Sequence, residues 1–368
     1  AERGVETRET RLIVTSEIFD NDGKAVGMTR VAFSLERENS VLARTRRDLA
    51  VGGAIVMVVT AALLIALTRN RLVRPLMGLV EVAKHIEQGD LKERAPERGD
   101  AEIATLARAF NNMGDAIAER ERKLRRELQV AADLQLSILP KDAKIVGAQV
   151  AASMKPTTEV GGDYYDIIPT ADGAWIGIGD VSGHGLEAGV IMLMIQSAVS
   201  ALVACKPDAS PVEVECAVNR VLYENIRDRM GLRDHATLSI LRYSNDGTVR
   251  FAGAHEDLIV YRAATRSIET FETPGTWVGV RGDISKVTVE SKLVLAADDV
   301  LVLYTDGVTE AMREGEQFGF QRLVEIVKRS ARGAAHEVRE SILGAVAEWT
   351  AVPSDDVSVV VLRQRPRG

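Results

Sequence analysis

The sequence is poor in the residues on which soft-metal, redox and disulfide chemistry depend. Its two cysteines, Cys205 and Cys216, match no zinc-binding or redox spacing, and they are too few for a disulfide scaffold. Its five histidines are scattered along the chain, which excludes a histidine-rich zinc site. Basic residues are outnumbered, and the net charge of −7 is opposite to that of a general nucleic-acid-binding protein.

The rest of the composition is that of an ordinary globular protein. The 368 residues are 46% hydrophobic and 27% charged, which excludes disordered and collagen-like chains. At about 150 residues per domain, this length predicts two or three domains. The sequence contains no internal repeat and no low-complexity tract.

One uncharged run breaks the globular pattern. Residues 49–67 contain no charged side chain, and a helix of that length is about 29 Å long, close to the thickness of a bilayer core. Arginines flank both ends in equal number, so the positive-inside rule assigns no orientation. We expect a transmembrane helix over residues 49–68. The alternative, a buried globular helix, is disfavoured by the charges on both sides.

Two β-like runs precede this helix. Residues 11–19 and 25–35 are separated by the turn signal Asn21-Asp22-Gly23-Lys24, and a helix-like stretch begins at Glu36. Two strands bury no core on their own. The pair resembles the closing hairpin of a Cache- or PAS-like sensor. We therefore expect residues 1–48 to be the C-terminal remnant of an extracytoplasmic sensor domain.

Two heptad patterns follow the apolar run. They extend from Leu72 to Ile86 and from Ile103 to Ile117, with apolar residues alternately three and four positions apart. Each helix has only a narrow apolar stripe, so the economical arrangement is a parallel four-helix bundle built by two chains. The segment resembles a HAMP domain in the blocks Arg74-Pro75-Leu76, Gly89-Asp90-Leu91, Glu102-Ile103 and Phe110-Asn111-Asn112-Met113. We expect a HAMP domain over residues 69–122 and a homodimer.

The second heptad pattern continues to Ile138. It passes through Arg120 and Glu127, which are poor seam residues, and a polar seam costs stability. Residues 123–143 are therefore predicted to form a weak, adjustable coiled-coil linker whose helix Pro140 stops. A histidine kinase would carry a phosphoacceptor histidine here, and the linker has none.

From Lys144 the pattern changes to short strands and turns. Strands and helices do not alternate regularly, which favours an α+β fold with antiparallel sheets over a doubly wound fold. The expected strands cover residues 150–154, 165–169, 175–179, 236–243, 248–252, 258–261, 286–295, 300–305 and 357–362. The expected helices cover residues 186–204, 211–229, 320–330 and 335–346.

Aspartates stand at the ends of several of these strands, beside glycines or turns. They are Asp163, Asp180, Asp306 and the pair Asp355 and Asp356. If the strands are neighbours, at least four carboxylates converge, which is costly unless divalent cations offset their repulsion. An oxygen-only ligand set favours Mg²⁺ or Mn²⁺. Two such ions hold a bridging hydroxide and clamp a phosphoryl group for in-line displacement.

Four ordered blocks carry a resemblance to SpoIIE/RsbU-type PPM serine/threonine phosphatases. They are residues 161–166 (GGDYYD), 179–185 (GDVSGHG), 303–310 (LYTDGVTE) and 355–359 (DDVSV), preceded by the RsbU-like linker run 131–140. For residues 144–368 the resemblance implies two sandwiched antiparallel sheets flanked by helices, and a dinuclear Mn²⁺ or Mg²⁺ centre that activates water. It implies metal binding by the carboxylates of Asp163, Asp180, Asp306 and Asp355, and by the Val181 carbonyl.

Four features depart from the wider family or stay open. Asp356 stands where the family usually has Asn, so the choice between Asp355 and Asp356 is open. His184 lies beyond the position of the family's proposed general acid, and we expect it to act structurally at the start of the helix 186–204. Asp166 is either close to the ligands or a surface turn residue. The family's phosphate-binding arginine has no match before Asp163.

These features together predict a membrane-bound, signal-regulated protein phosphatase of the bacterial inner membrane. The phosphatase domain is expected in the cytoplasm, with the N-terminus outside. The resemblance implies a phosphoserine or phosphothreonine protein substrate, with a STAS-domain anti-sigma factor antagonist as the leading candidate. The alternative from another class is a catalytically silent binding module. A diguanylate cyclase is disfavoured, because Tyr164-Tyr165 follows Gly161-Gly162-Asp163 where that family has Glu-Phe.

Overall fold

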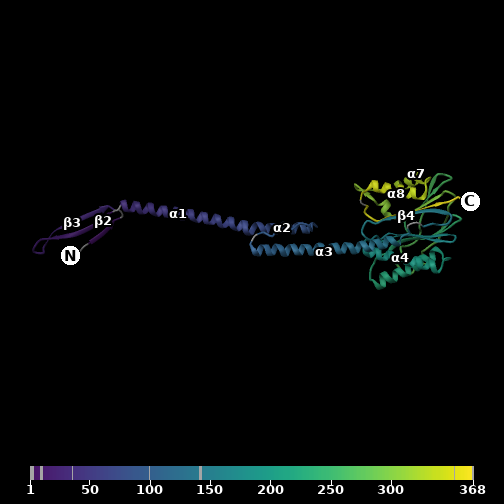
Figure 1. The fold of residues 1–368 in the computed structure, drawn as a ribbon, viewed down its shortest axis with the longest axis horizontal. Helices are drawn as coiled ribbons and strands as arrows, with labels where there is room; N and C mark the ends of the chain where they lie inside the picture. Colours follow the sequence, from purple (N-terminus) through teal and green to yellow (C-terminus); the bar gives the residue numbers. More distant parts are fainter. Residues whose placement is uncertain are drawn as a thin grey trace. The chain divides into compact units, whose positions relative to one another are not determined.

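The computed structural model describes residues 4–8, 11–34, 36–98, 100–140, 143–351 and 353–366. The chain divides into two compact units, residues 1–121 and 122–368, which are described separately (Figure 1). The first unit contains a small sheet and long helices. The second contains most of the strands.

An antiparallel sheet of three strands, β1 (Gly4–Arg8), β2 (Arg11–Phe19) and β3 (Ala25–Ser34), begins the described chain. The Asp20 carboxylate accepts the backbone N–H groups of Asp22 and Lys24 at 3.0 and 2.9 Å, which stabilises the turn between β2 and β3. The predicted hairpin is confirmed up to Ser34, and Leu35 lies outside the described residues. The strand β1 was not predicted. All of β3 is exposed, so this sheet encloses no core.

The predicted membrane segment lies inside one long helix, α1 (Glu36–Thr68). None of its residues is buried. Its most apolar stretch has a mean hydropathy of 2.6, and its length and composition suit a membrane-spanning helix. A π-helical turn, η1 (Arg69–Val73), joins α1 to the next helix.

Two helices, α2 (Arg74–Glu87) and α3 (Ala101–Ile138), carry the predicted heptad patterns. An ion pair of 2.9 Å between Arg71 and Asp100 joins their N-terminal ends, so the two helices run parallel. Asn111 fastens the connecting loop to α3, because its side chain both accepts the N–H of Ala95 (2.9 Å) and donates to its carbonyl (3.0 Å). The small core between the helices consists of Leu79, Val82, Ala95 and Ala107, with Ile86 and Phe110 packed against it.

Part of the predicted heptad seam stays exposed in the single chain. Leu76, Leu106 and Met113 are 41%, 49% and 48% exposed, although each belongs to the apolar stripe. Val82 is buried where the pattern predicted Ala83. One chain therefore leaves part of the apolar stripes of its two helices uncovered.

The second unit is built on two five-stranded antiparallel sheets, with the strand orders β10-β9-β12-β15-β4 and β11-β8-β7-β6-β5. The strands are β4 (Ala148–Lys155), β5 (Tyr164–Thr170), β6 (Gly173–Val181), β7 (Ala236–Ser244), β8 (Thr248–Ala254), β9 (Leu258–Arg262), β10 (Ser267–Phe271), β11 (Ser291–Val294), β12 (Val300–Tyr304) and β15 (Val357–Gln364). A minor hairpin is formed by β13 (Met312–Arg313) and β14 (Glu316–Gln317). The inner faces of the two sheets meet in one apolar core, with Ile176, Leu241, Leu301 and Val360 among its members.

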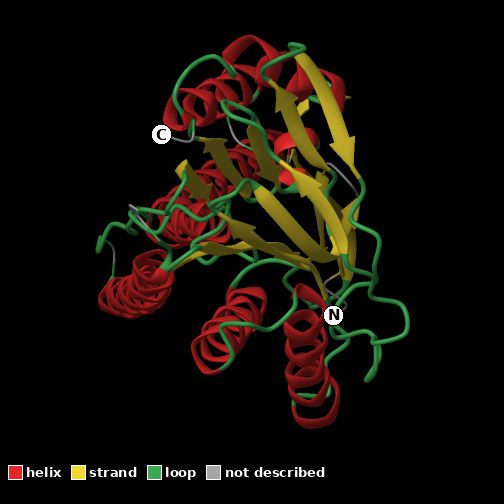
Figure 2. Ribbon diagram, turned by 90° about the vertical axis from the view of Figure 1, so that its right-hand side faces the viewer, coloured by secondary structure: helices red, strands yellow, loops and turns green. Residues whose placement is uncertain are grey.

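Helices cover both outer faces of this sandwich (Figure 2). The helices α4 (Leu186–Cys205) and α5 (Pro211–Tyr223), continued by the π-helical turn η2 (Glu224–Arg229), pack on the sheet that contains β6. The helices α7 (Phe320–Ser330) and α8 (Ala335–Trp349) pack on the sheet that contains β12. The predicted α+β fold is confirmed. Although α4 is apolar enough to cross a membrane, its buried face belongs to this core.

Several predicted elements of the second unit differ from the observed ones, and the hairpin of β13 and β14 was not predicted. The strand expected over 286–295 is confined to β11, because the N–H groups of Val287 and Thr288 turn back to the carbonyl of Ile284 at 3.0 Å. The helix expected over 211–229 changes to a π-helix at Glu224. The edge strand β10 was not predicted, since it is short and three of its five residues are polar.

The last turns of α3 belong to the second unit. Ala132 and Gln135 are buried there, three residues apart on one helix face, and Leu139, directly after the helix, is buried as well. The predicted seam residues Leu124 and Leu134 are 56% and 63% exposed. The helix ends at Ile138, two residues before Pro140, as predicted.

Candidate metal centre

The four predicted ligand carboxylates come from four segments of the sandwich. Asp163 immediately precedes β5, and Asp180 lies near the end of β6. Asp306 opens the short helix α6 (Asp306–Thr309) directly after β12, and Asp355 stands two residues before β15. Neighbouring strands of one sheet carry the first two, and neighbouring strands of the other sheet carry the last two. A site made by all four therefore lies across both sheets.

The pKa shifts of these side chains show that their carboxylates lie close enough to repel one another. Burial, and then the charges of Asp306 and Asp355, raise the pKa of Asp180 to about 8. Burial and the neighbouring Asp180 raise the pKa of Asp163 well above its usual range. Burial and Asp355 also raise the pKa of Asp306. Carboxylates that face one another in this way are stable as anions only beside positive charge.

The donor set fits divalent cations. The Oδ1 atom of Asp306 is buried and has no hydrogen-bond partner among the described residues. A buried carboxylate oxygen without a partner is costly, and a cation relieves that cost. The group offers carboxylate oxygens with no cysteine or histidine ligand, which suits Mg²⁺ or Mn²⁺.

The backbone comes unusually close to itself beside Asp163. A Cβ atom at Gly162 would lie 3.1 Å from the carbonyl oxygen of Val181, and 3.3 Å from the Cβ of Ala188 in the first turn of α4. A Cβ atom at Gly161 would lie 2.5 Å from Oδ2 of Asp356. The glycine pair thus permits the Val181 carbonyl, a predicted ligand, to approach the Asp163 segment.

Asp356 makes contacts of a different kind from those of Asp355. Its Oδ1 accepts the N–H of Thr157 at 2.6 Å, and its Oδ2 accepts the N–H of Gly162 at 2.7 Å. It is 4% exposed. Both of its oxygens therefore hold the loop before Asp163, and its charge also raises the pKa of Asp163 and of Asp180. The charge of Asp355 raises the pKa of Asp180 and of Asp306, and one of its oxygens accepts the N–H of Asp356 at 2.8 Å.

Thr305 was not singled out in the sequence, although it lies inside a quoted block. Its hydroxyl donates to Oδ2 of Asp163 at 2.8 Å and accepts the N–H of Ser358 at 3.0 Å. It is fully buried. The hydroxyl fixes the Asp163 carboxylate from the opposite sheet. In the sequence, only the position of Thr305 directly before Asp306 indicated that it belongs to the site.

Two other residues were considered from the sequence, His184 and Asp166. His184 is exposed in the turn before α4. Asp166 lies in β5 at 6% exposure and accepts the N–H of Ile167 at 2.8 Å, so it is neither a surface turn residue nor among the charges that act on the four aspartates. Burial raises the pKa of the Asp166 carboxyl.

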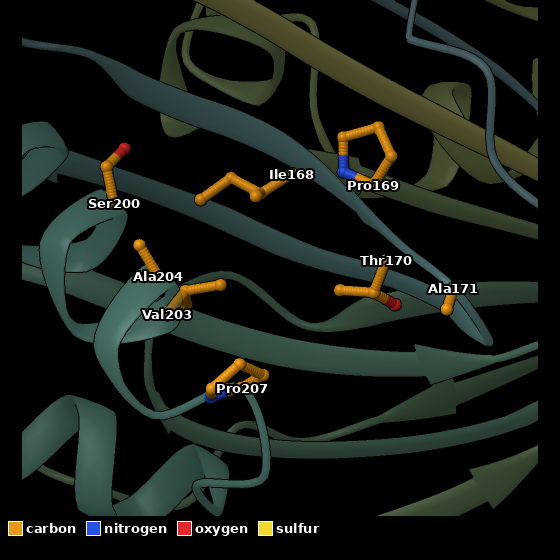
Figure 3. Close-up of a pocket in the computed structure, with 8 residues that line it drawn as sticks. All are labelled: Ile168, Pro169, Thr170, Ala171, Ser200, Val203, Ala204 and Pro207. Carbon is orange, nitrogen blue, oxygen red and sulfur yellow. The ribbon is translucent and has the colours of Figure 1, made fainter.

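A separate hollow lies at the far end of β5 from Asp163. It has a volume of about 350 Å³ and lies between the end of β5 and the last turn of α4 (Figure 3). Its lining includes Ile168, Pro169, Val203 and Pro207. The lining has no carboxylate, so this hollow offers nothing to the reaction expected at the aspartates.

The family model of Stage II sporulation protein E (SpoIIE) matches residues 170–365, more than half of the chain. The chain belongs to the SpoIIE family. Its second unit is a PP2C/SpoIIE-type serine/threonine phosphatase domain. The match contains Asp180, Asp306 and Asp355, and begins just after Asp163.

Known proteins resemble this SpoIIE-family chain over the same region. Phosphoserine phosphatase RsbU of Bacillus subtilis is 25% identical over 252 residues, which cover 67% of this chain and 72% of RsbU. The SiaA-PP2C domain of Pseudomonas aeruginosa has a TM-score of 0.58 at 21% identity, and the match covers 67% of this chain and 99% of that domain. The RsbU and RsbW domains of Rv1364c from Mycobacterium tuberculosis match at a TM-score of 0.50 and 20% identity, over 62% of this chain and 64% of that one. These structures establish the fold.

The HAMP domain model matches residues 67–119. This segment follows directly on the apolar part of α1, the helix with the length and composition of a membrane span. In this SpoIIE-family chain a helix that is long and apolar enough to span a membrane leads into a HAMP domain.

Proposed function

We propose that this chain is a signal-regulated, metal-dependent protein serine/threonine phosphatase. The observation that carries the proposal is the group of four mutually repelling aspartates, drawn from two sheets, in a chain of the SpoIIE family. A merely structural role does not explain why Asp306 keeps a buried carboxylate oxygen without a partner.

The proposed site holds two Mn²⁺ or Mg²⁺ ions. Asp163, Asp180, Asp306 and Asp355, with the Val181 carbonyl, would be the ligands. Of the pair left open by the sequence, Asp355 is the proposed ligand, since Asp356 already binds two backbone N–H groups. The ions when bound would supply a nucleophilic hydroxide near neutral pH and neutralise the phosphoryl oxygens. The four aspartates would act in catalysis through that metal-activated water, with their positions fixed in advance by the strands.

The proposed domain arrangement follows the chain order. Residues 1–48 would end an extracytoplasmic sensor domain, and residues 49–68 would cross the bacterial inner membrane. Residues 69–122 would form the HAMP domain and 123–143 the linker. Residues 144–368 would be the phosphatase domain in the cytoplasm, where magnesium and phosphoproteins are available.

The proposed substrate is a phosphoserine or phosphothreonine on a regulatory protein, with a STAS-domain anti-sigma factor antagonist as the leading candidate. Two similarities support this choice. The relative RsbU is a phosphoserine phosphatase. The similar Mycobacterium tuberculosis chain joins an RsbU domain to an RsbW domain, so a phosphatase domain of this kind occurs beside a regulatory partner.

The proposed regulation acts through the linker helix. The side chain of Gln135 donates to the carbonyl of Gly161 at 2.7 Å, and its Oε1 accepts the N–H of Gly161 at 3.0 Å. Gly161 lies two residues before Asp163. A change in the packing of the HAMP and linker helices would therefore reach the first metal ligand through Gln135. In the sequence, the contact was indicated only by the spacing of Gln135, three residues after Ala132 and four before Leu139.

The chain is proposed to act as a homodimer through its HAMP and linker helices. The exposed seam residues Leu106, Met113, Leu124 and Leu134 support this, because a second copy would cover them. The buried face of the linker that bears Gln135 is a different face, so dimerisation and contact with the phosphatase domain are compatible.

The test uses the full chain in lipid nanodiscs and a STAS-domain protein phosphorylated on serine with ³²P. We expect phosphate release that requires Mn²⁺ or Mg²⁺ and is lost in Asp180→Asn. Binding of the phosphoprotein without any release would instead support the alternative function, a catalytically silent binding module.

A further inference from the structure

The two halves of the proposed metal centre belong to different sheets, so their separation depends on how the sheets are held against each other. Asp180 and Val181 lie on β6, and Asp306 follows β12. Apolar contacts between the sheets are not directional. A polar connection close to the ligands would fix their spacing far more sharply.

Such a connection runs through Thr237 on β7. Thr237 is paired with Asp180 across the β6–β7 ladder. The N–H of Asp180 donates to the Thr237 hydroxyl at 3.1 Å, and the same hydroxyl lies 3.3 Å from the Asp180 carbonyl oxygen. The same hydroxyl lies 2.8 Å from Nδ1 of His255.

His255 continues the connection to the other sheet. Its Nε2 lies 3.0 Å from the carbonyl oxygen of Tyr304, the last residue of β12. A carbonyl only accepts, so Nε2 carries the proton and donates it. The backbone of His255 is fastened as well, since its N–H donates to the hydroxyl of Thr273 at 2.9 Å.

The protonation state of the imidazole agrees with this direction of hydrogen bonding. Burial of the ring lowers the pKa of His255 to about 4. At neutral pH the ring is therefore uncharged, and with the proton on Nε2 its Nδ1 accepts from the Thr237 hydroxyl. The hydrogen bonds then run in one direction, from the Asp180 N–H through the Thr237 hydroxyl and the imidazole to the Tyr304 carbonyl. The hydroxyl proton has a second, more distant acceptor in the Asp180 carbonyl at 3.3 Å.

We infer that Thr237 and His255 form a hydrogen-bonded link that sets the distance between the Asp180–Val181 and Asp306 halves of the metal centre. This rests on the proposed function. Both are positioning residues, because neither is a proposed ligand. Loss of the link would leave the fold in place and weaken cation binding, since the ligands on the two sheets would no longer be held at one separation.

The experiment measures Mn²⁺ binding to the full chain in detergent, by the electron paramagnetic resonance signal of free Mn²⁺, together with thermal unfolding. Thr237→Val keeps the shape and removes the hydroxyl, while Thr237→Ser keeps the hydroxyl. Thr288→Val is the matched control: Thr288 is 7% exposed, and its hydroxyl donates to the Ile284 carbonyl at 3.0 Å. His255→Leu and His255→Gln repeat the comparison at the other half of the link.

We expect Thr237→Val and His255→Leu to weaken Mn²⁺ binding about tenfold or more, and Thr288→Val to leave it unchanged at a similar loss of thermal stability. Thr237→Ser should restore most of the affinity. Equal Mn²⁺ affinities for Thr237→Val and Thr288→Val would overturn the link while leaving the phosphatase proposal intact. A wild-type chain that binds no Mn²⁺ and releases no phosphate would overturn both.

Discussion

Removing the side chain of Gln135 is the perturbation that most directly tests communication between the linker and the site. Gln135→Ala deletes both hydrogen bonds to Gly161, of 2.7 and 3.0 Å. Gln135 is 2% exposed, so water has little access to the freed groups. A buried backbone group that loses its partner costs about 1–3 kcal/mol.

That cost falls on the loop that carries Asp163. If about 1–2 kcal/mol of it appears as loosening of this loop, Mn²⁺ binding weakens about 5–30-fold. Two measurements on the full chain check this: Mn²⁺ affinity, and hydrogen exchange of the Gly161 amide, which should become faster. Gln129→Ala is the matched control, because Gln129 is an exposed glutamine on the same helix. Unchanged Gly161 exchange and Mn²⁺ affinity in Gln135→Ala would refute this route of communication.

Three further predictions concern the glycine contact, a buried acid and the dimer. Gly162→Ala should weaken Mn²⁺ binding measured by calorimetry, because the new methyl would lie 3.1 Å from the Val181 carbonyl and push it away from the Asp163 segment; Gly344→Ala, in α8 with no atom within 4 Å of the new methyl, should bind Mn²⁺ normally. Burial raises the pKa of Glu215, whose two carboxylate oxygens have no partner among the described residues. Below about pH 4.3, the pKa of a glutamate in the unfolded chain, Glu215 is protonated in both states and its raised pKa does not change the free energy of unfolding. As the pH rises above that value, the free energy of unfolding falls by about 1.4 kcal/mol per pH unit until the folded pKa is reached. Glu215→Met should therefore raise the melting temperature more at pH 8 than at pH 5, and an equal effect at both would contradict this account. In a chain without its native cysteines, Leu106→Cys should form disulfide-linked dimers in membranes, whereas Arg108→Cys, at a residue paired with Glu97, should do so much less.

The sequence was sufficient for the parts of the fold that follow from local pattern. The heptads predicted α2 and α3, and Pro140 predicted where α3 ends. Continuous apolar runs predicted the central strands such as β12, which is buried throughout. Edge elements were missed, because β10 and β1 are short and polar and are held in place by their neighbours rather than by their own composition.

The same division applies to the site. Aspartates beside glycines at strand ends were visible as candidates from the sequence alone. The contacts that distinguish Asp355 from Asp356 were not, because Asp356 bonds to Thr157 and Gly162, almost two hundred residues away. The roles of Thr237 and Gln135 also depend on pairings between distant segments, which no local pattern encodes.

The central claim is that the aspartate group hydrolyses phosphoserine through bound cations. Its most direct test is phosphate release from a phosphoserine protein by the full chain, with and without Mn²⁺, for wild type, Asp306→Asn and Asp298→Asn. Asp298 is the matched control, since it pairs with Arg363. Removing one of the repelling charges should not destabilise the metal-free protein, so Asp306→Asn should fold. The account predicts Mn²⁺-dependent release by wild type and Asp298→Asn and none by Asp306→Asn; equal release by Asp306→Asn, or release that does not depend on a divalent cation, would contradict it.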